Sequence, residues 1–406
     1  MPCWSWKVAL PFTSSSLPCF SDGQEPDMSK LKGVLRRLAS RWDMVDPTIW
    51  TRHRPGGQLK AKGGVVDKGM PELEDSAVQR LLSAYRSSRP ASHYGADSMW
   101  RGFFETRQSR MHDIFINGSI SEARKVLSNP GESDLFYGFD NLFAEFVQRL
   151  RRSSSLRESY ARNCLDDLLC FAEAVGALRC ENPESELRSN SGFSAEDVLA
   201  KLENALGVRI TFPNPYPAEF GLATSRGVAS YRAIHALDLA LRVRQLLKEI
   251  PSPKVLEIGA GLGRSAYFAT RFGLPGYEIV DLPFTAISQG YFLISTLGAD
   301  RVTLAGEAAS DQAGCVRLTT PSDFLASSAR YDLVVNVDSF TEIDPQVAQH
   351  YWQKVEASAT RFLSINHEIN PLTVKDLYDQ SRRVKRAFRL PCWLRRGYVE
   401  ELVEFV

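Results

Sequence analysis

Apolar positions repeat with two different periods along this chain. From Pro71 to Gly207 they recur mostly three and four residues apart, as on the buried face of an amphipathic helix, and full stripes run from Phe139 to Leu150 and from Leu165 to Ala172. From Lys254 onward, short apolar runs rich in Val, Leu and Ile alternate with helical patterns. The first pattern predicts a helical region, and the second predicts strands separated by helices.

The second part of the chain predicts a mostly parallel sheet, led into by a long helix at 228–250. Strands are expected at 254–258, 276–281, 331–337 and 361–366, with the third strand at either 301–305 or 315–319. Helices are expected at 262–272, 285–297 and 345–358, and an antiparallel strand pair in the tail, 389–406. Because strands and helices alternate over short connections, the predicted fold class is α/β, a Rossmann-like, doubly wound sheet preceded by a helical domain.

Local composition divides the chain further. Residues 1–30 are rich in Ser and Pro and are expected to form a disordered arm. Residues 31–225 are expected to form a mainly helical domain that ends in a connector with the proline-locked segment 213–217. Residues 226–406 are expected to form the sheet domain. The helical domain shows no chemistry of its own, so the candidate chemistry is sought in the sheet domain.

The first expected strand runs directly into a glycine-rich turn. In Val255-Leu-Glu-Ile-Gly-Ala-Gly-Leu-Gly263 the three glycines let the backbone turn sharply and leave no Cβ between the chain and a ligand. The helix that follows offers free N–H groups and the positive end of its dipole. Such a turn is typical of a site for a nucleotide-like cofactor.

Residues around the turn indicate which cofactor it takes. A dinucleotide site uses Gly-x-Gly-x-x-Gly, whereas Arg264 occupies the position of the last glycine here. The Glu257 carboxylate would repel a pyrophosphate but would suit a ligand that carries ammonium and sulfonium charges. Asp281, at the end of the second expected strand, can accept hydrogen bonds from both hydroxyls of a ribose. Together these residues predict S-adenosylmethionine.

These features resemble the class I S-adenosylmethionine-dependent methyltransferases over residues 227–406. That family carries an acidic-x-Gly-x-Gly-x-Gly motif at the first strand and a ribose-binding acid at the end of the second. The resemblance implies a methyltransferase (a transferase) whose cofactor is S-adenosyl-L-methionine. The cofactor-binding residues that it implies are Glu257, Gly259, Ala260, Gly261, Gly263, Asp281, Leu282 and Asn336.

A narrower resemblance comes from the fourth and fifth expected strands. Segments 331–342 and 362–366 resemble the sugar O-methyltransferase family, which has Asn-x-x-Ser-x-x-Glu after the fourth strand and Ser/Cys-x-Asn at the end of the fifth. His367 departs from the pattern, because a basic residue such as Arg is expected there. The resemblance implies methylation of a sugar (glycan) hydroxyl in glycan biosynthesis, with Ser339 and Asn366 binding the substrate.

Methyl transfer to a sugar hydroxyl needs a general base, because the hydroxyl is a poor nucleophile until its proton is removed. The candidates are Asp338, Glu342 and His367, which follow the fourth and fifth strands. His367 is favoured because imidazole titrates nearest neutrality, although it could equally fix a loop. Asp338 and Glu342 could instead bind sugar hydroxyls or cap a loop, and no metal is assigned to them. The amides of Asn336 and Asn366 could tie strand ends together.

Rival functions remain open at this point. The same cofactor could serve N- or O-methylation of a non-sugar small molecule, because acceptor choice depends on loops rather than on the cofactor motif. A NAD-dependent oxidoreductase is disfavoured by Arg264 and Glu257. A non-catalytic binding module on the same fold is disfavoured by the intact set of cofactor residues.

Composition limits the partners. The chain has 406 residues and a net charge of +1, which gives no global attraction to nucleic acid or membrane. Without a spanning apolar run, a secretory leader or C-x-x-C spacing among its 7 cysteines, a cytoplasmic location with reduced thiols is expected. Residues 382–396 carry seven Lys or Arg and no acid, which is usual for a solvated face but would also suit a phosphate-linked acceptor. The oligomeric state stays open.

Overall fold

Residues 59–89, 98–180, 192–308, 310 and 312–406 are described by a computed structural model. The expected disordered arm, 1–30, lies outside these residues. All described residues fall within one structural unit, which runs from Pro47 to Val406. None of the helices in the described ranges combines the length and the apolar character that crossing a membrane requires.

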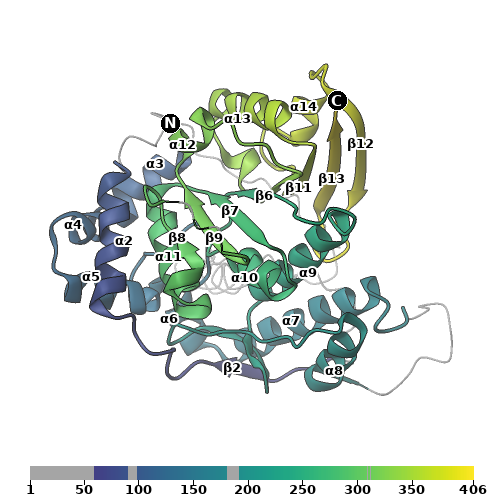
Figure 1. The fold of residues 1–406 in the computed structure, drawn as a ribbon. Helices are drawn as coiled ribbons and strands as arrows, with labels where there is room; N and C mark the ends of the chain where they lie inside the picture. The colour runs from purple at the N-terminus through teal and green to yellow at the C-terminus, as the bar shows by residue number, and fades with distance from the viewer. Residues whose placement is uncertain (1–58, 90–97, 181–191, 309, 311) are drawn as a thin grey trace, which may run out of the picture. The chain divides into compact units, whose positions relative to one another are not determined.

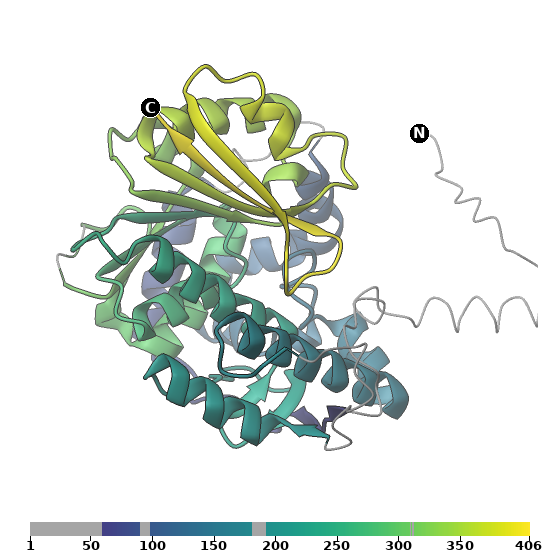
Figure 2. The same cartoon turned by 90° about the vertical axis from the view of Figure 1, so that its right-hand side faces the viewer.

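A central sheet organises the C-terminal half of the chain (Figure 1). Its strands are β6 (Val255–Ile258), β7 (Gly276–Val280), β8 (Val302–Thr303), β9 (Cys315–Thr319), β10 (Leu333–Val337), β11 (Arg361–His367), β12 (Val384–Pro391) and β13 (Tyr398–Phe405). Their order across the sheet is β12-β13-β11-β10-β6-β7-β9-β8, and β13 alone runs in the direction opposite to the other strands. The predicted α/β class, a Rossmann-like and mostly parallel sheet, is thereby confirmed. Figure 2 shows the antiparallel C-terminal hairpin, in yellow, at the edge of the sheet.

The third strand, which the sequence left between two segments, is β9. It pairs in parallel with β7, while β8 pairs with the outer side of β9 and extends the sheet by one short strand. The tail pair begins at Val384, earlier than the predicted 389. The chain leaves β6 toward β7 and β9, and later returns to the other side of β6 with β10 and β11. This reversal creates a switch point between β6 and β10, where ligands bind in such sheets.

Helices cover both faces of the sheet, as the alternation of strand side chains requires. Val255, Ile279 and Val335 face the core shared with α9 (Tyr231–Leu246), α10 (Arg264–Arg271) and α11 (Pro283–Leu297). Leu256 and Val334 face the opposite core, which is shared with α12 (Pro321–Ala326), α13 (Pro345–Ser358) and α14 (Val374–Tyr378). Every one of these strand residues is at most 2% exposed, so the sheet is buried from both sides.

The N-terminal region packs on the α9–α11 side and continues the same apolar core. Its helices are α2 (Asp75–Ser87), α3 (Met99–Phe103), α4 (Ser109–Asn117), α5 (Ile120–Ser128), α6 (Ala144–Arg152), α7 (Ser154–Ala174) and α8 (Ala195–Leu206). Short strands accompany them: β1 (Leu59–Lys60) pairs with β3 (Phe193–Ser194), and β4 (Phe220–Thr224) pairs with both β2 (Gly63–Val65) and β5 (Gly227–Ala229). Strand β4 lies in the predicted connector, just after its proline-locked segment 213–217.

The predicted helical stripe 139–150 is helical only from the start of α6. Gly138 has a φ of 95°, and the Asp140 side chain accepts a hydrogen bond from the backbone N–H of Leu142 at 3.1 Å. A positive φ and a side chain that bonds two residues ahead are both turn features, and they compete with helix formation. Phe139 therefore lies in a turn, from which it reaches the sheet domain.

Candidate active site

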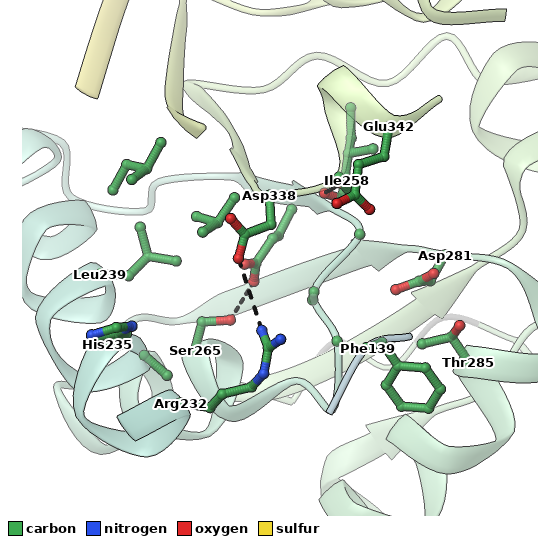
Figure 3. A pocket seen from close by; sticks show the side chains of 18 of the residues that line it. Phe139, Arg232, His235, Leu239, Ile258, Ser265, Asp281, Thr285, Asp338 and Glu342 are labelled. Carbon is green, nitrogen blue, oxygen red and sulfur yellow. Dashed lines mark hydrogen bonds and ion pairs between the residues drawn. The ribbon is translucent and has the colours of Figure 1, made fainter. Parts of the chain in front are cut away.

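A cavity of about 550 Å³ opens where the parallel strands end, at the switch point between β6 and β10. Its walls come from the glycine turn after β6, the ends of β7, β10 and β11, helices α7 and α9, and the loop between β12 and β13. Figure 3 shows Asp281 and Thr285 toward one end of this cavity and His235 and Leu239 toward the other. We call these the turn end and the α9 end.

The glycine turn has the conformation that its sequence predicts. Gly259, Gly261 and Gly263 all have positive φ, at 74°, 57° and 78°. A Cβ built on Gly259 would lie 2.1 Å from the Oγ of Ser339, so a side chain cannot fit there even apart from the backbone strain. Gly259, Ala260 and Gly261 line the cavity, whereas Gly263 caps α10 beneath it.

Glu257 lies at the base of the turn and lines the cavity with 2% of its surface exposed. Its Oε2 accepts hydrogen bonds from the hydroxyls of Ser265 and of Tyr277, the latter at 2.9 Å. Burial raises its pKa to about 7, against the opposite effect of these hydrogen bonds. Within the described residues this carboxylate has no cationic partner.

Asp281 follows β7 and lines the cavity together with Leu282. Its carboxylate accepts from the backbone N–H of Leu282 at 2.8 Å and from the side-chain amide of Gln289 at 2.7 Å. The same Gln289 nitrogen donates to the carbonyl of Gly261 at 2.9 Å, which ties the carboxylate to the glycine turn. Burial raises the pKa of Asp281 to about 7, since its partners only partly replace the lost water.

Asp338 stands directly after β10 with a φ of 67°, in the region that side chains rarely adopt. Arg395 donates to it at 2.9 Å, and Arg232 of α9 lies 3.8 Å away, as the dashed line in Figure 3 marks. Burial alone would raise the pKa of Asp338, but the two guanidinium groups outweigh it and hold the pKa below its ordinary value. The carboxylate is thus a counter-ion for two arginines and a weak base.

His367 ends β11 and lines the cavity opposite Glu342. Its Nε2 lies 3.9 Å from the Glu342 carboxylate, and its ring packs edge-on against Tyr398 at 5.5 Å. The Glu342 carboxylate raises the pKa of His367 above 6.5 despite partial burial. The other ring nitrogen, Nδ1, has no hydrogen-bond partner among the described residues. The structure therefore brings together two of the three predicted base candidates as a pair.

Ser339 lines the cavity, but Asn336 and Asn366 do not. The Asn336 amide donates to the Ile258 carbonyl at 2.8 Å and to the Ser339 hydroxyl at 2.6 Å. Asn366 in turn donates to the Asn336 carbonyl oxygen at 2.9 Å. These buried amides join the ends of β6, β10 and β11, which is the strand-tying alternative that the sequence left open.

The α9 end of the cavity holds polar groups that the sequence did not single out. Nε2 of His235 lies 3.1 Å from Oδ2 of Asp167 on α7, and burial lowers the pKa of this histidine. Asp238 also lines the cavity, and burial raises its pKa to about 7. Arg232, His235 and Leu239 recur at helical spacing, so one face of α9 is turned to the cavity. The spacing of these residues is visible in the sequence, but the apolar stripes of the helix predicted only that it is buried.

The two candidate third strands are followed by two different segments, at Glu307 and near 321–323, and either could have contacted the adenine of the cofactor. Pro321 and Ser322 of α12 line the cavity. Glu307 does not; it forms an ion pair with Arg80 of α2 at 2.5 Å instead. The segment near 321–323 is therefore the one that reaches the cavity.

Comparisons with known proteins add little to this geometry. No family model and no curated protein match the sequence. Magnesium protoporphyrin IX methyltransferase from Synechocystis PCC 6803, solved with bound SAM, is 14% identical over 42% of this chain and 79% of its own, with a TM-score of 0.30. Mitomycin 7-O-methyltransferase is 16% identical over 43% of this chain and 55% of its own, with a TM-score of 0.29.

The methyltransferase domain of bacterial CtHen1 is 13% identical over 42% of this chain and 99% of its own, with a TM-score of 0.32. Likeness at this level does not extend to activity, cofactor or substrate. Function has to be argued from the residues of the cavity.

Proposed function

We propose that this protein is an S-adenosylmethionine-dependent O-methyltransferase that methylates a sugar or glycan hydroxyl. The observation that carries the proposal is the pair of desolvated carboxylates at the glycine turn, Glu257 and Asp281, which line one cavity. Both have pKa values of about 7, raised by burial, and neither has a cationic partner among the described residues. A ligand with cationic groups and ribose hydroxyls would supply what both carboxylates lack.

S-adenosylmethionine fits these residues and, when bound, supplies a methyl group activated by its sulfonium. Glu257 would hold the cationic part of the cofactor, and Asp281 would accept hydrogen bonds from its ribose hydroxyls. Gly259, Ala260 and Gly261 let the backbone approach without side chains. A NAD cofactor fits less well, because the buried Glu257 carboxylate would face its pyrophosphate.

His367 is the general base in this proposal. Its imidazole would accept the proton of the acceptor hydroxyl, and Glu342 would stabilise the imidazolium that forms. Asp338 is unsuited to this role, because its pKa is lowered and it is paired with Arg395. Holding the acceptor oxygen near the cofactor methyl would supply much of the remaining rate enhancement.

A hydroxyl-rich acceptor suits the α9 end of the cavity. His235, Asp167 and Asp238 offer hydrogen-bond acceptors there, and Tyr160 and Tyr231 line the same end. Since Asp167 and Tyr160 belong to α7, we also propose that the helical domain, 31–225, covers the acceptor side of the methyltransferase domain, 226–406. Methylation of nitrogen or of a non-sugar small molecule would use the same cofactor residues.

A phosphate-linked acceptor has support from one residue of the basic segment 382–396. Arg396 lines the cavity and is exposed, and it forms no ion pair within the described residues. Arg389, in contrast, forms ion pairs with Glu368 and Glu401. Turnover of phosphorylated and neutral glycans should differ if Arg396 binds the phosphate, and equal turnover would dismiss this acceptor class.

Calorimetric titration with S-adenosylmethionine, with NAD as a control ligand, tests the proposal first. We expect micromolar binding of S-adenosylmethionine, loss of that binding in Asp281→Ala, and no binding of NAD. Mass spectrometry of a glycan panel incubated with the protein and cofactor would then identify an acceptor by its added methyl group. If the wild-type protein did not bind S-adenosylmethionine, the proposed cofactor and therefore the proposed function would be rejected.

A further inference from the structure

The N-terminal region reaches the glycine turn itself, through a segment of three residues, 138–140. Phe139 lines the cavity although it is only 7% exposed. A Cβ built on Gly261 would lie 3.6 Å from the backbone oxygen of Phe139, which is van der Waals contact. The turn that would hold the cofactor is therefore covered by a residue that lies far from it in the sequence.

A buried ion-pair network fixes this segment in place. Arg264, the first residue of α10, donates to Oδ2 of Asp140 at 2.5 Å and to Oε1 of Glu219 at 2.9 Å. The three side chains are 7%, 7% and 4% exposed. Charges this deeply buried need their partners, because removing one leaves the others uncompensated. Buried ion pairs thus join the segment 138–140 to the start of α10, directly after the glycine turn.

Phe139 lies at the turn end of the cavity, where Asp281 also lies. Figure 3 shows its ring beside Thr285, on the same side as Asp281 and away from His235. Trp100, which also lines the cavity, belongs to the same N-terminal region. An aromatic ring in this position offers an apolar surface to the flat, partly apolar adenosine half of a nucleotide-like ligand.

We propose that Phe139 is a cofactor-binding residue, which covers the adenosine half of S-adenosylmethionine, and that Arg264 and Asp140 position it. This inference rests on the proposed function, since it takes S-adenosylmethionine as the cofactor. It gives the helical domain a share of the cofactor site as well as the acceptor side. Neither the glycine motif nor the acids at the strand ends contain this residue.

Titration of the full chain with S-adenosylmethionine and with adenosine tests the assignment of Phe139. We expect Phe139→Ala to weaken the binding of both ligands by about tenfold, in line with the loss of one aromatic contact to a base. Phe139→Leu keeps an apolar side chain of similar bulk and should weaken binding by a smaller factor. Phe143→Ala is the matched control: Phe143 packs against Tyr137 and Phe146, does not line the cavity, and should leave both affinities unchanged.

Thermal midpoints measured without ligand separate loss of folding from loss of binding. If Phe139→Ala does not fold, the leucine variant decides the question. Unchanged affinity in a folded Phe139 variant would overturn the assignment while the proposed function stands. A loss for S-adenosylmethionine but not for adenosine would also overturn it, because the contact would then lie with the methionine half. Failure of the wild-type protein to bind S-adenosylmethionine would instead reject the proposed function.

The positioning role is tested with Asp140→Asn, which keeps the shape of the side chain and removes its charge. Asp140 does not line the cavity, so only an indirect effect on binding is available to it. We expect weaker binding of adenosine, by severalfold, at a temperature where the variant is fully folded. Unchanged binding in the folded variant would show that Arg264 and Asp140 only stabilise the fold, and would remove this part of the proposal.

Discussion

Arg395 donates through one guanidinium nitrogen to both carboxylate oxygens of Asp338, at 3.0 and 2.9 Å. The contact joins the loop of the C-terminal hairpin to the end of β10, and both residues line the candidate active site. Because Arg232 of α9 lies on the same carboxylate at 3.8 Å, three separate elements meet at Asp338. Asp338 thus joins three parts of the cavity wall, and a carboxylate whose pKa is lowered by two guanidinium groups is a poor general base.

Asp338→Asn should therefore lower stability while leaving most of kcat in place. The substitution leaves Arg232 and Arg395 without their common counter-charge, and we expect the free energy of unfolding in urea to fall by about 2 kcal/mol. The pH at which activity is half-maximal should fall somewhat, because the Asp338 charge contributes to the raised pKa of His367. A fall in kcat of about 10²-fold or more in Asp338→Asn would instead place the base at Asp338.

His367→Gln should remove the base and lower kcat by a factor of about 10² to 10⁴. The dissociation constant of S-adenosylmethionine should remain as in the wild type, since His367 lies apart from the glycine turn. Glu342→Gln should keep partial activity. The acid limb of its pH–rate profile should move to lower pH, because the Glu342 carboxylate raises the pKa of His367. Rate measurements between about pH 5 and 9 with a saturating acceptor would check both variants. An acid limb that does not move in Glu342→Gln would contradict the coupling of Glu342 to His367.

Glu257 makes stability depend on pH in a defined direction. Its pKa is raised from 4.5 to about 7, so between these values the folded protein binds more protons than the unfolded chain. The free energy of unfolding should then fall as the pH rises from about 4.5 to 7, by roughly 3 kcal/mol from this group. Asp281 and Asp238 act in the same sense, so the informative quantity is the difference between wild type and Glu257→Gln. That difference should change with pH, and a constant offset would contradict it.

Gly259 and Gly176 form a matched pair for testing the turn. Both have similar positive φ, 74° and 72°, but a Cβ on Gly176 would have nothing within 4 Å, whereas one on Gly259 would meet Ser339. Gly176→Ala should cost only the backbone strain, about 1 kcal/mol. Gly259→Ala should cost more and should abolish S-adenosylmethionine binding. An equal loss in the free energy of unfolding for the two substitutions, measured by chemical denaturation, would show that the Ser339 side chain moves aside.

His235→Ala should weaken acceptor binding and leave the affinity for the cofactor unchanged. We expect the KM for a glycan acceptor to rise about tenfold, because one well-placed hydrogen bond at a buried site is lost, with kcat nearly unchanged. His350 on α13 is exposed and does not line the cavity, so His350→Ala serves as the control. A collapse of kcat in His235→Ala, at unchanged KM, would point to His235 as a base in place of His367.

Local patterns were enough for the sheet and for the core of the site. The apolar runs located β6, β7, β10 and β11 to within a few residues, because a strand buried on both faces needs a continuous apolar sequence. The glycine spacing and the acids at 257 and 281 were equally readable, since a turn with positive φ admits few residue types. Topology then requires the ends of parallel strands to meet at one edge.

Local patterns failed where a residue's role depends on a distant partner. The stripe 139–150 has helical spacing, yet Phe139 lies in a turn against Gly261. Arg264 could be seen to break the dinucleotide motif, but its two carboxylate partners come from other parts of the chain.

The sequence by itself determined the strands, the glycine turn and the meeting of Glu257 and Asp281 at one cavity, because these depend on neighbours along the chain and on the rule that parallel strands end together. Only the tertiary structure decided that His367 pairs with Glu342, that Asp338 is a counter-ion, and that Asn336 and Asn366 join strands. It also decided which segments of the N-terminal region reach the cavity. Contacts of this kind depend on how whole layers pack, and burial and pKa follow from that packing rather than from residue type.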